Sequence, residues 1–230
     1  MSKEPTHILG RFQRALDELV EDLNRMSAIV TRSLENAFRG LRDRDTSLCA
    51  QVIADDEEVD QLEMKLDEEG LKIIMLYQPV ASDLRKVVSV MKVSSNLERV
   101  GDQAVGIAKR GRKLNKSLEL PETRLVEPVY DKAASLLRRS LEAFREGKVE
   151  VALEVKDEDA ELDKAYKAVA KQLTGRMEED SGRVKDYLDL QFVVRFLERI
   201  GDHAKNIAED AVFAESAHDI RHGGERPEID

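Results

Sequence analysis

An eight-residue segment of this chain occurs twice, one hundred positions apart, and no other feature limits the possible folds as strongly. The first copy is Leu97-Glu98-Arg99-Val100-Gly101-Asp102-Gln103-Ala104, and the second is Leu197-Glu198-Arg199-Ile200-Gly201-Asp202-His203-Ala204. Apolar residues continue the match at the same offset on both sides of these segments. The sequence therefore predicts an internal duplication with two units of a little over one hundred residues each.

Apolar residues in both copies recur every three or four positions, which is the period of an amphipathic α-helix. Strand-like alternation and hairpin turn motifs are missing from the sequence. We therefore expect an all-α protein in which one stripe per copy faces a core. The stripe residues are Val90, Val93, Leu97, Val100, Ala104 and Ile107 in the first copy, and Leu190, Val193, Leu197, Ile200, Ala204 and Ile207 in the second.

Six helices are expected from this periodicity and from the positions of proline and glycine. They run from about 8 to 41, 46 to 76, 83 to 113, 128 to 147, 151 to 173 and 184 to 217. Short connections make neighbouring helices antiparallel, so each half is predicted to be a three-helix bundle. We place the boundary in the proline-containing segment 115–127, which gives bundles over 1–117 and 118–217 and a flexible tail over 218–230.

Composition narrows the classes of partner. A net charge of −10 argues against a nucleic-acid-binding surface, which needs a basic face to neutralise phosphates, and it suits cation binding. The sequence has no run of about 18 apolar residues and no signal-peptide pattern near Met1, so we expect a soluble cytoplasmic protein without membrane insertion. The lone Cys49 is expected to pack as a small apolar residue.

Each repeated segment carries two acidic residues one helical turn apart, beside the apolar stripe. These are Glu98 and Asp102 in the first copy, and Glu198 and Asp202 in the second. Like charges at this spacing cost about 0.2 to 0.5 kcal/mol, and the glycine between them costs about 1 kcal/mol more. A cation held by the carboxylates would explain why both costs occur twice. The alternative is a solvated charged face with glycine at a tight helix crossing.

A second acidic motif, with the pattern acid-x-x-apolar-Asp, repeats at an offset of 103. It contains Asp56 and Asp60 in the first half and Asp159 and Asp163 in the second. If the neighbouring helices are antiparallel, each of these pairs approaches the acid pair of the repeated segment. Four carboxylates would then share a small volume, and all-oxygen ligation favours Mg²⁺, Ca²⁺, Mn²⁺ or iron.

The two copies differ near these acids, so we expect the two sites to differ in affinity or in the number of ions. His203 is either a metal ligand or a surface histidine beside an acid. Arg99 and Arg199 either donate to the carboxylates, which we favour, or point to solvent. The differing pairs are Glu63 and Tyr166, Gln103 and His203, and Gly106 and Asn206.

Together with the segment Gln78-Pro79-Val80-Ala81-Ser82-Asp83-Leu84-Arg85, the repeated motifs carry a resemblance to a known family. Over nearly its whole length the chain resembles the PhoU family of phosphate-signalling regulators. The resemblance implies two tandem three-helix bundles that pack side by side and bind divalent or trivalent metal ions, singly or in small clusters. Carried over by position, the metal ligands are Asp56, Asp60, Glu98, Asp102, Asp159, Asp163, Glu198 and Asp202.

The resemblance also implies a role without catalytic residues. Family members act with the ATPase of the phosphate ABC transporter and with a sensor histidine kinase, and they repress the phosphate-starvation response when phosphate is ample. By the same analogy we expect a regulator of phosphate transport and homeostasis, with a homodimer as its assembly.

Two other classes of function compete with this interpretation. A carboxylate-bundle metalloprotein for metal storage or redox chemistry needs paired Glu-x-x-His motifs facing a bundle core. Only Glu215 and His218 have that spacing in a helix-compatible segment. A purely structural helical protein with solvated acid pairs is the third class. The sequence contains no glycine-rich phosphate loop, so it gives no support for direct binding of nucleotide or phosphate.

Overall fold

The structure is a computed structural model that describes residues 4–221, 224 and 227. No strand occurs within this described part, and the predicted all-α class is confirmed. The elements in chain order are α1 (Glu4–Arg42), α2 (Thr46–Ala54), α3 (Asp56–Tyr77), α4 (Ala81–Leu114), the 3₁₀ helix η1 (Pro121–Val126), α5 (Glu127–Glu146), α6 (Val149–Glu179), the 3₁₀ helix η2 (Ser181–Arg183) and α7 (Val184–Ser216).

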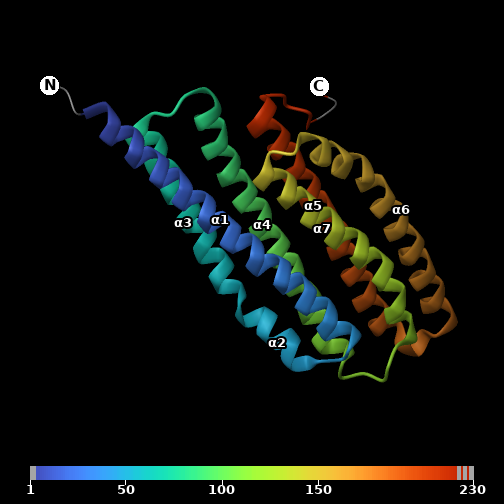
Figure 1. The fold of residues 1–230 in the computed structure, drawn as a ribbon. Coiled ribbons are helices and arrows are strands. Elements are labelled where there is room, and N and C mark those ends of the chain that lie inside the picture. The colour runs from blue at the N-terminus through green and yellow to red at the C-terminus, as the bar shows by residue number, and fades with distance from the viewer. Residues whose placement is uncertain (1–3, 222–223, 225–226, 228–230) are drawn as a thin grey trace.

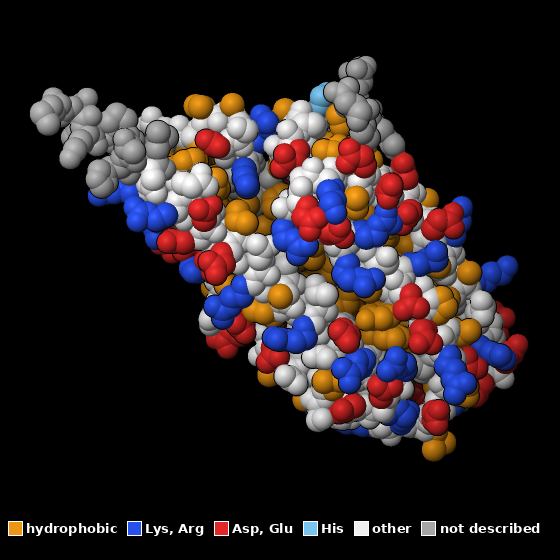
Figure 2. All heavy atoms as spheres, viewed as in Figure 1, with side chains coloured by type: hydrophobic (Ala, Val, Ile, Leu, Met, Phe, Trp, Pro, Cys, Tyr) orange, Lys and Arg blue, Asp and Glu red, His pale blue; other side chains and the backbone are white. Residues whose placement is uncertain are grey.

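Two helical bundles lie side by side, one built from α1 to α4 and the other from α5 to α7 (Figure 1). On the face formed by α1 and α5, basic and acidic side chains are interspersed (Figure 2). The net negative charge is therefore not gathered into one patch on that face.

The helix predicted from 46 to 76 is in fact two helices, separated by a turn at Asp55. Asp45 caps the first of them, because its Oδ1 accepts hydrogen bonds from the backbone N–H groups of Ser47 and Leu48. The second helix starts with three acids, Asp56, Glu57 and Glu58. Free N–H groups in a first helical turn favour negative charge, so a new helix start at this acidic run is stabilised.

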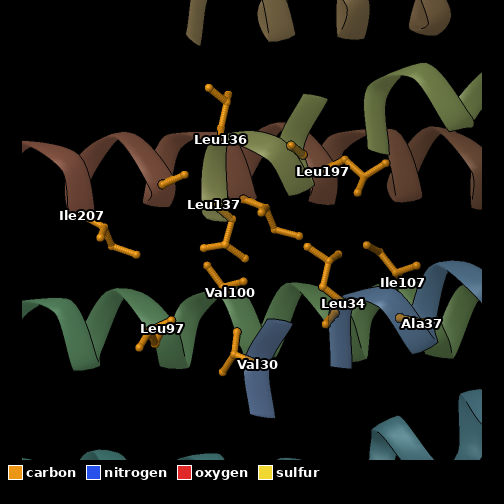
Figure 3. Close-up of a cluster of buried hydrophobic side chains, with 14 of the residues drawn as sticks. Val30, Leu34, Ala37, Leu97, Val100, Ile107, Leu136, Leu137, Leu197 and Ile207 are labelled. Atoms are coloured by element: carbon orange, nitrogen blue, oxygen red, sulfur yellow. The ribbon is translucent and has the colours of Figure 1, made fainter. Parts of the chain in front are cut away.

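The hydrophobic core forms along the predicted stripes. Figure 3 shows Leu97 and Val100 of α4 and Leu197 and Ile207 of α7 among side chains of α1 and α5. This confirms the assignment of the buried helix faces. The twelve residues that define the stripes have no exposed surface: Val90, Val93, Leu97, Val100, Ala104, Ile107, Leu190, Val193, Leu197, Ile200, Ala204 and Ile207.

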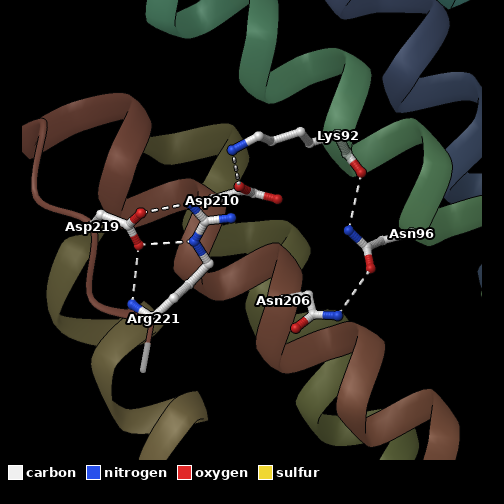
Figure 4. A network of polar contacts seen from close by, with 6 residues as sticks. All are labelled: Lys92, Asn96, Asn206, Asp210, Asp219 and Arg221. Atoms are coloured by element: carbon white, nitrogen blue, oxygen red, sulfur yellow. Dashed lines mark hydrogen bonds and ion pairs between the residues drawn. The ribbon is translucent and has the colours of Figure 1, made fainter. Parts of the chain in front are cut away.

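Helices α4 and α7 run antiparallel and make the most extensive contact between the bundles. Asn206 Nδ2 donates to Asn96 Oδ1 at 3.3 Å, and Lys92 Nζ lies 3.3 Å from Asp210 Oδ1 (Figure 4). We call this contact between α4 and α7 the seam.

The counterparts of these residues, one hundred positions away, also meet across the seam. An added Cβ at Gly106 would lie 2.8 Å from Cε2 of Phe196, and the Arg110 guanidinium stacks over the Phe192 ring at 4.1 Å. When the two repeats are exchanged, the contacts of Asn96 and Lys92 with α7 are thus replaced by those of Phe196 and Phe192 with α4. The repeats are related by an approximate twofold axis through the seam.

The segments outside the bundles are more ordered than predicted. The segment 115–127, expected to be a linker, contains η1, and Pro128 lies in the first turn of α5. In the tail predicted to be flexible, the Ile220 side chain is buried and its carbonyl accepts a hydrogen bond from Lys156 Nζ. Residues 222–223, 225–226 and 228–230 of that tail lie outside the described part.

Candidate metal centres

The eight predicted ligands lie on two pairs of adjacent helices. In the first bundle Asp56 and Asp60 lie on α3 and face α4, which carries Glu98 and Asp102. We call these four residues the first acid cluster. The second acid cluster consists of Asp159 and Asp163 on α6 with Glu198 and Asp202 on α7. The half-buried members are Asp56, Glu98, Asp159, Asp163 and Glu198, and the exposed ones are Asp60, Asp102 and Asp202.

A buried glycine lies beside each cluster and lets the two helices approach closely. An added Cβ at Gly101 would meet Val59 Cγ1 at 3.4 Å and Asp56 Oδ1 at 3.9 Å. At Gly201 the corresponding distances are 2.1 Å to Leu162 Cδ2 and 3.7 Å to Asp159 Oδ1. The glycine of each repeated segment therefore brings an aspartate of the facing helix next to its own helix backbone.

The carboxylates of the first acid cluster raise one another's proton affinity. Burial raises the pKa of Asp56, and the nearby charges of Asp60 and Asp102 raise it further. Burial also raises the pKa of Glu98, with Asp102 as the next cause. The negative charges of the cluster are therefore close enough to repel one another, which is the electrostatic setting that a bound cation relieves.

Glu63 joins this cluster, although the sequence analysis noted it only as a difference between the copies. Burial raises the pKa of Glu63, and Asp67 and Asp60 add to the shift. Its charge in turn raises the pKa of Glu98. Glu63 lies on α3 one turn beyond Asp60, and this spacing was the signal that marks it as a neighbour. In the second cluster Tyr166 replaces it, so the two clusters differ in charge.

The second acid cluster contains lysines of its own. Lys205 Nζ lies 3.0 Å from Asp159 Oδ2, and Lys167 Nζ lies 3.4 Å from Asp163 Oδ2. Partial desolvation of its carboxylate raises the pKa of Asp202, although the residue is exposed, and Asp159 is the largest charge that adds to the shift, while Lys205 opposes it. Burial, followed by the charge of Asp202, also raises the pKa of Glu198.

The chemistry of both clusters fits a hard or borderline cation. Carboxylate oxygens come from two adjacent helices, and a glycine keeps the helices close. In the second cluster the ammonium group of Lys205 already lies beside a carboxylate, where a metal ion would bind. Within the described part of the chain, no three His, Cys, Asp or Glu side chains already stand together as metal ligands. Like charges favour this separation, and a bound ion would neutralise them.

His203 and Arg99 take positions that the sequence left open. His203 is half-buried, and its Nδ1 lies 3.1 Å from Asn96 Oδ1 across the seam, so it is not a free surface histidine. Burial lowers the pKa of His203, and the charges of Arg99 and Arg199 lower it further. Arg99 Nε lies 3.4 Å from Glu98 Oε2 and its side chain is 63% exposed, so Arg99 forms an ion pair with one carboxylate of the first acid cluster and also faces solvent.

The difference between Gly106 and Asn206 is explained by packing at the seam. Phe196 occupies the space that a side chain at Gly106 would fill, whereas Asn206 reaches Asn96 at the counterpart position. Gly106 and Asn206 thus serve the contact between the repeats.

The Glu-x-x-His match at Glu215 and His218 does not form a helical ligand pair, whereas Glu4 and His7, which have the same spacing, lie within α1. Helix α7 ends at Ser216, and Ala217 has a left-handed φ of 62°, so Glu215 and His218 are not on one helix face. His218 Nδ1 instead lies 2.9 Å from the Ser216 carbonyl oxygen. Among the described helices, none combines the length and the apolar character that crossing a membrane requires.

Known proteins resemble this chain in domain family, in sequence and in structure. The sequence-family model of the PhoU domain matches this chain twice, over residues 23–111 and 126–211. The phosphate-specific transport system accessory protein PhoU homolog of Pseudomonas putida is 35% identical over 219 residues, which is 95% of this chain and 86% of that protein. The phosphate-specific transport system accessory protein PhoU of Escherichia coli strain K12 is 31% identical, over 95% of this chain and 90% of its own length.

Solved structures agree with these matches. The crystal structure of PhoU from Pseudomonas aeruginosa superposes with a TM-score of 0.86 at 33% identity, over 88% of this chain and 98% of that one. The phosphate transport system regulatory protein PhoU from Streptococcus pneumoniae gives a TM-score of 0.82 at 25% identity, over 95% of this chain and 100% of that one. The duplicated domain, the sequence identities and the shared fold together show that this chain belongs to the PhoU family.

Proposed function

We propose that this chain is a non-enzymatic, metal-binding accessory protein of phosphate uptake, which represses the phosphate-starvation response when phosphate is ample. The names of the relatives support the transport part of this proposal. The Pseudomonas putida and Escherichia coli proteins are both named accessory proteins of the phosphate-specific transport system, and the Streptococcus pneumoniae structure is titled a regulatory protein of phosphate transport.

The acid cluster that occurs in both repeats, with a glycine beside it, is the observation that carries the metal-binding part. In each repeat the glycine brings an aspartate of the facing helix next to the helix that holds the Glu-x-x-x-Asp pair. A solvated charged face does not require this close approach, because exposed acids repel each other least when they are far apart. Manganese, magnesium, iron and calcium are the candidate ions.

Two reactive side chains have structural roles, which supports a function without catalysis. Cys49 is buried, and burial raises the pKa of its thiol to about 11, so the thiol stays protonated near neutral pH. His203 is engaged with Asn96 at the seam. Regulation by contact with other proteins requires neither a nucleophile nor a general base.

The partners we propose are the ATPase of the phosphate transporter and the sensor histidine kinase, in the cytoplasm, with a homodimer as the assembly. A pull-down of each purified partner by the immobilised chain, in excess Mn²⁺ and in chelator, tests this. We expect metal-dependent retention of at least one partner by the wild-type chain. The variant Asp102→Asn/Asp202→Asn should lose this dependence, because each substitution removes a charged ligand from one cluster.

The control is Asp17→Asn/Asp131→Asn, which removes two exposed aspartates outside both clusters. It should behave as the wild type with respect to metal. Equal retention in Mn²⁺ and in chelator by all three proteins would contradict metal-dependent regulation. Retention of neither partner under any condition would contradict the choice of partners.

A further inference from the structure

The two acid clusters differ in the residue that lies three positions after the aspartate of each repeated segment, Asp102 or Asp202. In the second cluster this residue is Lys205, and in the first it is Val105. Lys205 Nζ lies 3.0 Å from Asp159 Oδ2, and the Asp159 side chain is only 15% exposed. Val105 is buried and supplies no charge.

Lys205 reaches from α7 to α6, across the same gap that the carboxylates of the second cluster line. Asp159 comes from α6, and Asp202 lies one turn before Lys205 on α7. Asp56 is the counterpart of Asp159. Within the described residues its side chain has no hydrogen bond or ion pair, and Lys109 is the cation that lowers its pKa. An ammonium group is thus paired with the α6 aspartate of the second cluster, whereas the described ion pair of the first cluster joins Arg99 to Glu98, at 3.4 Å, and leaves the α3 aspartate without such a partner.

We propose that the Lys205 ammonium group occupies the second acid cluster as an internal cation, and that a metal ion binds there only by displacing it. This inference rests on the proposed metal-binding function. Since one group must leave before an ion can bind, the second cluster is the weaker metal site and the first cluster is filled before it. Lys205 is therefore a residue that sets metal affinity.

A second carboxylate lies within reach of the displaced side chain. Glu209 follows Lys205 by four residues on α7 and is its neighbour on the helix surface. Glu209 is buried and already pairs with Lys156, at 2.8 Å between Lys156 Nζ and Glu209 Oε1. A displaced ammonium group would therefore still lie near a negative charge, which lowers the free-energy cost of displacing it.

Titration calorimetry with MnCl₂ at constant ionic strength tests the proposal. The background is Glu98→Gln/Asp102→Asn, which disables the first cluster so that binding reports the second. Adding Lys205→Met to this background should tighten Mn²⁺ binding by about tenfold or more, which is the scale of one charge-assisted contact. The control Lys185→Met removes a lysine of α7 outside the cluster and should leave the affinity within about twofold of the background.

Two further proteins keep the test decisive. Lys205→Gln retains a polar side chain and should tighten binding as Lys205→Met does, which guards against poor folding of the methionine variant. A chain carrying Asp159→Asn/Asp202→Asn and an intact first cluster should bind Mn²⁺ more tightly than the Glu98→Gln/Asp102→Asn background does.

The outcomes separate this inference from the function on which it rests. Unchanged Mn²⁺ affinity in both Lys205 variants, with binding at the second cluster still measurable, would overturn the role of Lys205 alone. Absence of Mn²⁺ binding in the wild type and in every variant would instead overturn the metal-binding function.

Discussion

At the residue scale, the two glycines beside the clusters are required to different degrees. A methyl group at Gly101 would be in ordinary van der Waals contact with Val59 and Asp56. At Gly201 the same methyl group would lie 2.1 Å from a methyl carbon of Leu162, which is buried and must move. The same substitution therefore has opposite expected effects on the free energy of unfolding.

We expect Gly101→Ala to leave stability unchanged or raise it by up to about 1 kcal/mol, because alanine favours the helix. Gly201→Ala should lower stability by about 1 to 3 kcal/mol, because the core beside it is overpacked. Urea unfolding in chelator measures both. A larger loss for Gly101→Ala than for Gly201→Ala would contradict the packing described beside the two clusters.

The raised pKa values of Asp56 and Glu98 give the metal-free protein a defined pH dependence. An acid whose pKa is higher in the folded than in the unfolded state takes up its proton first in the folded state. Protonation of such an acid therefore stabilises the fold at low pH, and this stabilisation is lost as the pH rises through the raised pKa.

Lowering the pH from about 7.5 to about 5 should therefore stabilise the wild type relative to Asp56→Asn/Glu98→Gln when both are in chelator. The double variant is the reference because it lacks both titrating groups but shares every other one. Urea unfolding at several pH values measures the difference. A wild-type stability, relative to the double variant, that stays constant or falls as the pH is lowered would mean that the two carboxylates are not destabilised by their surroundings.

The eight acids of the clusters could be selected from the sequence because their spacing repeats. Glu63 and Lys205 are missed by this reasoning, since each occurs in one copy only and a repeat search weights what both copies share. Gly106 was also unexplained, because its reason is the Phe196 ring from the other repeat. Contacts between residues far apart in the chain leave no periodic trace in a single sequence.

At the element scale, the long amphipathic helices were predictable within a few residues because their apolar period persists over many turns. The turn at Asp55 was not, because the apolar stripe continues across it from Val52 to Val59. An acidic run such as Asp55-Asp56-Glu57-Glu58 is compatible with a solvated helix face as well as with a helix start. Only the structure distinguishes the two.

Substitution of the leucine that begins each repeated segment tests the stripe assignment. Leu97 and Leu197 have no exposed surface and lie on α4 and α7, the two helices of the seam. Leu97→Ala and Leu197→Ala should each cost about 2 to 5 kcal/mol, through lost burial and the cavity left behind. Chemical denaturation measures the loss, and the exposed Leu118→Ala is the matched control. A cost below about 1 kcal/mol at either core position would contradict the assignment.

At the scale of the whole molecule, the duplication predicted two bundles but not how they are related. A duplicated sequence is compatible with either a translation or a twofold axis between its repeats. Antiparallel packing of α4 and α7, with Asn96 facing Asn206 and Gly106 facing Phe196, establishes the twofold relation. Hydrophobic periodicity defines which face of a helix is buried, but several arrangements of two bundles bury the same faces.

The central claim is that both acid clusters are metal sites, and it concerns the stability of the whole chain. Without a bound cation the carboxylates repel one another, so Asp102→Asn/Asp202→Asn should stabilise the chelator-treated protein or leave it unchanged. A metal ion that binds only the folded chain should stabilise the wild type by about 2.7 kcal/mol at one hundred times its dissociation constant. The double variant should gain less, because each cluster has lost a charged ligand.

Thermal melts of both proteins in chelator, in excess MnCl₂ or MgCl₂, and in NaCl of equal ionic strength make the most direct test. The predicted result is a melting temperature of the wild type that rises in metal well beyond its value in NaCl, with a smaller rise in the double variant. Metal-dependent shifts that are identical in the two proteins, or that do not exceed the shift in matched NaCl, would contradict the assignment of the clusters as metal sites.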